Sequence, residues 1–144
     1  MRRGYKLAFA ILAFGAAGAA QAFNISAKSE NPMIGQDGLR SATQQMASQV
    51  GSRIPDNADV KVTVFSRAQP SKIGQNQYIY LHRIELRRAF NAMSPPYPFA
   101  GWLPIETVER YGVGDDKEVR DELDHVLNEF FTKVKAIDPN VGIK

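Results

Sequence analysis

The chain has only two histidines, and the residues near each could take part in chemistry. Glu122 lies three residues before His125, which is the spacing of a Glu-x-x-His pair of metal ligands on one face of a helix. Di-iron bundles need a second such pair on another helix, and the sequence does not repeat the motif. Two interpretations stay open: a weak metal site, or an exposed helix face on which both residues join a series of charge pairs.

The other histidine, His82, lies two residues from Tyr80 and from Ile84. In a strand, this spacing places the three side chains on one face. A histidine there could serve as a base or as a pH-sensitive group. It could equally be a packed side chain with one hydrogen bond satisfied, and the sequence does not decide between these roles.

Motifs of common enzyme classes are missing from the sequence. It contains no G-x-S-x-G, no phosphate-binding glycine loop before a lysine, and no His-Glu-x-x-His. It also contains no cysteine, which excludes a thiolate nucleophile and a cysteine-based zinc site. We therefore expect no catalytic residue and no cofactor, and the order of hypotheses is a binding protein, then a small-ligand or metal-binding protein, then a small hydrolase.

The strongest candidate for binding is an aromatic segment rich in proline. Tyr97, Phe99 and Trp102 lie beside three prolines between positions 95 and 98. Aromatic side chains on a stiff backbone bind with little loss of conformational entropy. Alternatively, the three rings fold back and cover the end of the sheet. Arg83 and Arg87 precede this segment and could form a basic rim around it.

These residues must be positioned by two helices and three strands. Asp37 is a candidate cap for the first helix, and Asp115 with Glu118 forms a capping box at the start of the last one. Apolar residues recur at spacings of three and four along the last helix, whereas β-branched residues and alternation indicate the strands. The predicted helices span 37–50 and 115–137, and the strands span 60–65, 78–86 and 102–111.

The order of these elements predicts an α+β domain of two layers over residues 37–144. Short connections favour a three-stranded antiparallel sheet, with the N-terminal and C-terminal helices on one face. Residues 23–36 are predicted to be an extended lead-in, in which Phe23 and Ile25 could begin a short extra strand. Pro104 places one end of the last strand at a sheet edge.

Residues 1–22 have the pattern of a cleavable signal peptide. Arg2, Arg3 and Lys6 precede an apolar run, and Ala20 and Ala22 stand at the positions that a signal peptidase reads. Removal of this segment would leave equal numbers of basic and acidic residues. We therefore expect no nucleic-acid partner, because binding to phosphates needs a basic surface. We also expect no membrane anchor after cleavage, because the chain has no cysteine that could carry a lipid.

The C-terminal part resembles small uncharacterised envelope proteins of proteobacteria. The resemblance rests on residues 105–110, on the glycine turn at Gly112 and Gly114, and on the segment from Phe130 to Asn140. It implies a periplasmic module of accessory or assembly type, without identifying functional residues. We expect an exported, non-enzymatic module, periplasmic or secreted, that binds another envelope protein or a second copy of itself.

Overall fold

The structure is a computed structural model that describes residues 23–56, 59–92 and 99–137. The predicted signal segment, with Ala20 and Ala22, lies outside the described residues. The elements follow the order β1–α1–β2–β3–β4–α2. Their bounds are β1 Ile25–Glu30, α1 Gln36–Val50, β2 Val60–Pro70, β3 Tyr78–Ala92, β4 Phe99–Gly114 and α2 Asp116–Val134.

The sheet has four strands in the spatial order β1-β2-β3-β4, and it is mixed. Strands β2, β3 and β4 are antiparallel neighbours, whereas β1 runs parallel to β2. The α+β class is confirmed, but the predicted three-stranded antiparallel sheet is wrong. The added strand is the segment around Ile25, and α1 supplies the long crossover that a parallel pair requires.

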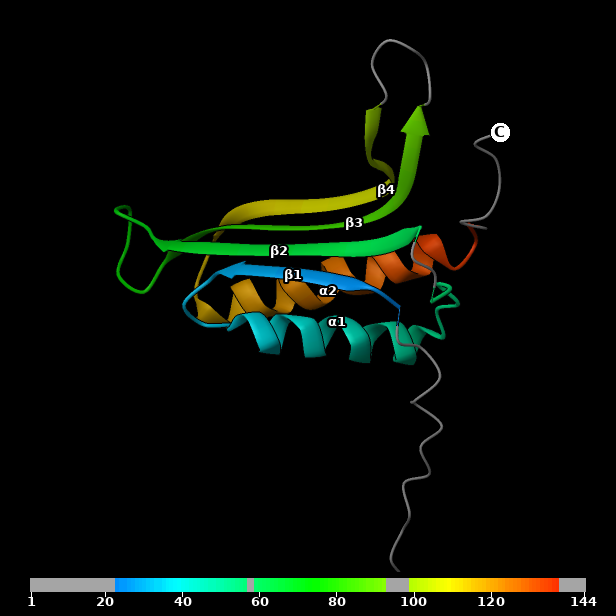
Figure 1. The fold of residues 1–144 in the computed structure, drawn as a ribbon. Coiled ribbons are helices and arrows are strands. Elements are labelled where there is room, and N and C mark those ends of the chain that lie inside the picture. The colour runs from blue at the N-terminus through cyan, green and yellow to red at the C-terminus, as the bar shows by residue number, and fades with distance from the viewer. Residues whose placement is uncertain (1–22, 57–58, 93–98, 138–144) are drawn as a thin grey trace, which may run out of the picture.

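Both helices cover the same face of this sheet (Figure 1). The core between the layers is formed by alternate residues of the strands, such as Val62 and Ile84, and by the buried apolar residues along one face of α2. Phe130 and Phe131 of α2 are fully buried and pack edge to face, with ring centroids 5.0 Å apart. No helix in the described part of the chain is long and apolar enough to cross a membrane.

The two helices begin differently. Asp115 caps α2 as predicted: its side chain accepts a hydrogen bond from the Glu118 backbone, and the Glu118 side chain accepts one from the Asp115 backbone. Asp37 does not cap α1, because the helix already begins at Gln36 and its N-cap residue is Gly35. Helix α1 buries Leu39, Thr43 and Ala47, whereas Ala42, Met46 and Val50 are only partly buried beside them.

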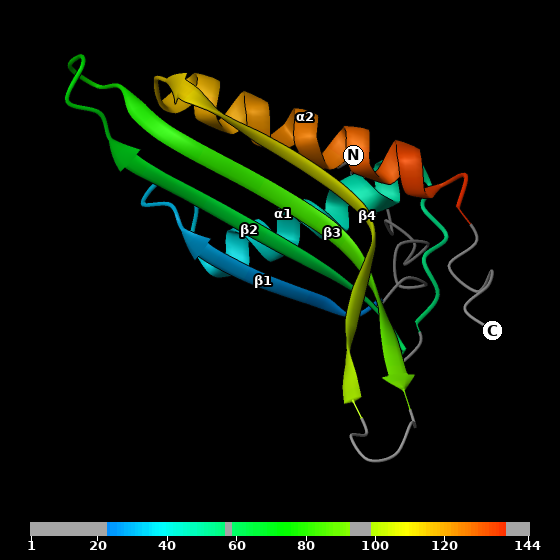
Figure 2. The same cartoon turned by 90° about the horizontal axis from the view of Figure 1, so that it is seen from above.

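Strands β3 and β4 are longer than predicted and form an arm beyond the rest of the sheet. Pairing with β2 ends where Val60 lies opposite Arg88, but β3 and β4 continue together to Ala92 and Phe99. A register shift between Leu86 and Arg87 marks the base of this arm. The arm bends there, away from the helices (Figures 1 and 2), as β-bulges commonly cause.

Candidate binding surface

The face of the sheet opposite the helices, here called the open face, is built by strand alternation. Along β2, Val60, Val62 and Val64 are buried against the helices, so that Lys61 and Thr63 between them lie on the open face. The same alternation sets the open face of the other strands. The open face carries more basic than acidic residues. The basic residues are Lys28, Lys61, Arg67, Arg83 and Arg87, and the acidic residues are Glu30, Glu85 and Glu109.

The two arginines predicted as a basic rim lie on the open face, and each is ion-paired. Arg83 reaches across to Glu109 of β4. Arg87 binds Glu85 with its Nε and Nη2 atoms, both 2.6 Å from the Glu85 Oε2 atom. Glu85 is buried although it faces away from the core, and Thr63 also donates a hydrogen bond to it, at 3.4 Å. These charges are therefore held in fixed positions and are partly neutralised.

Trp102 lies at the base of the arm and turns toward the sheet. The ammonium group of Lys61 lies 4.0 Å from the centroid of the Trp102 ring, a close cation–π contact. Lys61 belongs to β2 and Trp102 to β4, so the contact spans β3 and holds the bent arm to the open face. Of the other predicted aromatic residues, Phe99 begins β4 with its side chain outside the described part, and Tyr97 lies outside the described residues.

Exposed apolar side chains gather on the hairpin strands. Among the described residues, the large hydrophobic side chains that are clearly exposed are Ile73, Ile79, Leu103, Tyr111 and Val113. Tyr111 is 80% exposed and Val113 is 52% exposed, although both belong to a regular strand. Ile79 lies opposite Val113 in the register. An apolar cluster at this end of the open face is the type of feature that marks an interaction surface.

Two shallow hollows lie on the open face. One of about 210 Å³ is lined by Thr63, Phe65, Arg83, Glu85 and Arg87. A second, of about 320 Å³, lies near the apolar cluster and is lined by Arg67, Gln69, Ile79, Tyr80, Leu81 and Tyr111. Neither encloses its contents as a small-molecule pocket usually does. Their shape suits the side chains of a bound protein better than a buried ligand.

His82 is not part of this surface. It is fully buried, and its ring stacks on Tyr80 with centroids 5.2 Å apart. The Nε2 atom lies 2.9 Å from the Val119 carbonyl oxygen and therefore carries the proton, whereas Nδ1 accepts from the Ser66 hydroxyl at 3.0 Å. Burial lowers the pKa of His82, against weaker opposing effects of the Val119 carbonyl and of Glu122.

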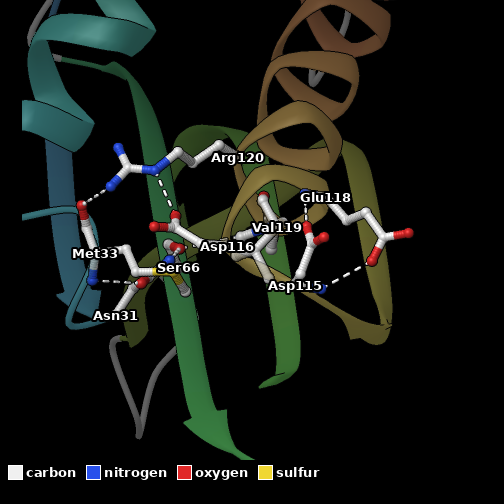
Figure 3. A network of polar contacts seen from close by, with 9 residues as sticks. Asn31, Met33, Ser66, Asp115, Asp116, Glu118, Val119 and Arg120 are labelled. Atoms are coloured by element: carbon white, nitrogen blue, oxygen red, sulfur yellow. Dashed lines mark hydrogen bonds and ion pairs between the residues drawn. The ribbon is translucent and has the colours of Figure 1, made fainter. Parts of the chain in front are cut away.

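A buried polar chain extends from Ser66 to the segment after β1. The side chain of Asn31 donates to the Ser66 hydroxyl at 3.1 Å and accepts from the Met33 backbone at 2.9 Å. Arg120, from the first turns of α2, donates to the Met33 carbonyl oxygen at 3.1 Å (Figure 3). Because Ser66 and His82 are both fully buried, this pair cannot reach a substrate. This series of hydrogen bonds instead connects β2, β3 and α2 with the segment that follows β1.

The Glu122–His125 pair lies on the exposed side of α2. The Nδ1 atom of His125 lies 3.6 Å from a carboxylate oxygen of Glu122, and the His125 side chain is mostly exposed. Within the part of the chain that the structure describes, no group of three or more potential metal ligands occurs. The metal site thus remains a prediction with two candidate ligands only.

Sequence reasoning missed the apolar cluster. Tyr111 ends the predicted strand 102–111, but its exposure depends on which face of the sheet the helices cover. No family model, curated protein or solved structure matches this chain. Its function is therefore inferred from its own geometry.

Proposed function

We propose that this protein is an exported, non-enzymatic module that binds another envelope protein through the open face of its sheet and the adjoining arm. The observation that carries the proposal is the one-sided distribution of exposed apolar side chains. Among the described residues, none of the five large exposed hydrophobic side chains belongs to a helix, and three of them, Ile79, Tyr111 and Val113, lie on the open face. The predicted signal segment supports export.

The chemistry of the open face defines the partner. Tyr111, Ile79 and Val113 would bury apolar area, while the excess of basic side chains over the whole open face favours an acidic rim on the partner. The ion pairs of Arg83 and Arg87 limit the rotamers of these side chains before binding, which reduces the entropy lost on association. The partner is thus an envelope protein with an apolar patch bordered by carboxylates.

Site-specific photocrosslinking in cells tests the surface. A photoreactive residue at Tyr111 should give one major adduct with an envelope protein. The same residue at Gln44, which is exposed on α1, is the matched control and should give none. Equal adducts from both positions, or no adduct from Tyr111, would refute binding through the open face.

The affinity between the purified protein and the purified crosslinked partner then gives the contribution of the apolar cluster to binding. Replacing Tyr111 and Val113 together by serine should weaken binding of the crosslinked partner by about tenfold or more, as for central interface residues. The melting temperature should hardly change, because both side chains are exposed in the free protein. Unchanged affinity in the doubly substituted protein would contradict the proposal.

A further inference from the structure

Strand β4 offers a long edge for pairing. Residues 106–114 pair with β3 without a register shift, and β4 is the last strand in the order of the described sheet. The outward backbone N–H and C=O groups of an edge strand are a template for a further strand. The opposite edge, β1, has only six residues, whereas this stretch of β4 is about 30 Å long at the usual rise per residue.

Four alternating charges follow this edge. On the helix-facing side of β4, the Arg110 Nη2 atom lies 2.8 Å from the Glu129 Oε2 atom of α2. Glu106, four residues earlier, lies 4.0 Å from Lys133, which in turn lies 2.9 Å from Glu129. Along β4, the acidic Glu106 is therefore followed by the basic Arg110. On α2, the basic Lys133 lies beside Glu106 and the acidic Glu129 lies beside Arg110.

This arrangement complements itself under a twofold rotation. If two copies of β4 align antiparallel with Val108 opposite Val108, Glu106 of each copy lies opposite Arg110 of the other. The same rotation brings Lys133 of one copy toward Glu129 of the other. Directly opposite side chains lie about 4.5–5.5 Å apart in such a pair, so each charge would meet an opposite charge.

We propose that a second copy of this chain binds along β4 in this antiparallel register, which joins two sheets into one sheet of eight strands. The two α2 helices would then lie antiparallel beneath the seam. Only their last two turns would meet, with Glu129 of each copy facing Lys133 of the other. The contact is isologous, so it closes at two copies.

The inference goes beyond the proposed function, because pairing at the β4 edge leaves the open face uncovered. Two open faces would lie side by side on the same surface, and the partner protein would meet a doubled platform. In this register the straight part of β4 pairs over residues 106–110, about 17 Å at the usual rise per residue, because residues 111–114 would lie opposite residues 102–105 at the bent arm. With the two ends of α2 beneath it, this seam is smaller than a standard interface. We therefore expect a dimer that dissociates at micromolar concentrations.

Charge reversal with complementation tests the register. Protein expressed from the full sequence should be dimeric by size-exclusion chromatography with light scattering at about 200 µM, a concentration above the expected dissociation constant. Glu106→Arg alone, or Arg110→Glu alone, places like charges opposite each other twice per dimer. Each variant should weaken the dimer by about tenfold or more.

An equimolar mixture of the two variants should restore the dimer. In the mixed pair, the introduced arginine faces the introduced glutamate, and the native Glu106 faces the native Arg110. Loss of a contact within one chain could not be rescued by mixing. Glu30→Arg, on the opposite edge, is the matched control and should leave the dimer intact.

A disulfide test remains informative even if a charge variant folds poorly. The chain has no cysteine, so Thr107→Cys and Glu109→Cys each add a single thiol. The proposed register places these positions opposite each other, within the distance range of a disulfide. Mixed oxidation should crosslink this pair faster than Thr107→Cys mixed with Tyr111→Cys.

Three outcomes would overturn the inference. These are a wild-type monomer at every concentration, a folded mixture of charge variants that stays monomeric, and faster crosslinking to position 111 than to position 109. None of them would affect binding through the open face. Loss of the photocrosslink at Tyr111 in a protein that still dimerises would instead refute only the proposed function.

Discussion

The fully buried His82 is the clearest case in which one side chain links several elements. It donates to the Val119 carbonyl oxygen and accepts from Ser66, which in turn accepts from Asn31. All three polar side chains are buried and partnered, which offsets the cost of removing them from water. The sequence allowed a packed histidine or a base, and the geometry assigns the packed role because no solvent reaches the ring.

This environment predicts a loss of stability in acid. The ordinary pKa of histidine, 6.5, is lowered in the folded protein because burial disfavours the charged ring. As the pH falls below about 6.5, the unfolded chain binds a proton that the folded chain does not. The free energy of unfolding should therefore fall by up to about 1.4 kcal/mol per pH unit until the folded histidine titrates.

Urea unfolding at pH values between about 5 and 8, the range in which histidine titrates, measures this effect. His82→Gln should flatten the dependence in this range, because the substituted side chain does not titrate. A wild-type protein equally stable at both ends of the range would show that His82 accepts a proton in the folded state.

At the scale of elements, the two helices differ in how their first turns are stabilised. The capping box of α2 satisfies backbone groups at both Asp115 and Glu118. Helix α1 begins at Gln36 without a side-chain cap, and Asp37 lies inside its first turn. An acidic residue there contributes only through the helix dipole.

Matched alanine substitutions should separate the two cases. Asp115→Ala should lower the free energy of unfolding by about 1 kcal/mol, because the Glu118 backbone amide loses its acceptor. Asp37→Ala should cost less than about 0.5 kcal/mol. Chemical denaturation of the two variants gives the comparison, and an equal loss in both would mean that the capping box adds nothing beyond charge.

At the scale of the whole molecule, protection from solvent should follow the position of each strand in the sheet. Strands β2 and β3 have neighbours on both sides, β1 and β4 have one, and the arm has two strands only. Local opening is easiest where few neighbours hold the backbone. Hydrogen exchange should therefore be slowest in the central parts of β2 and β3 and fastest in residues 89–92 and 99–102.

The same measurement reports on assembly. If two copies pair along β4, amides in residues 106–110 should exchange more slowly as the protein concentration rises, while those of β1 should not change. Rapid exchange in β2 at a rate equal to that of the arm would contradict the described order of strands.

The sequence by itself determined the elements whose patterns are local. The apolar periodicity and capping box of α2 depend on residues within one helix, and both were predicted correctly. The edge position of Pro104 also followed from chemistry, because proline cannot donate a ladder hydrogen bond. The cap of α1 was predicted wrongly, because the helix begins at Gln36 and Gly35 takes the N-cap position, which leaves Asp37 inside the first turn.

Tertiary structure alone decided how these elements combine. Strand β1 is too short and too polar to be certain from its own residues, and it is fixed by parallel pairing with β2, some 35 positions later in the chain. The lateral order of the strands then determines which side chains are buried, exposed or in contact. It buries His82, exposes Tyr111, and brings the charges of β4 beside those of α2, because burial and cross-strand contact are properties of neighbours that are distant in the sequence.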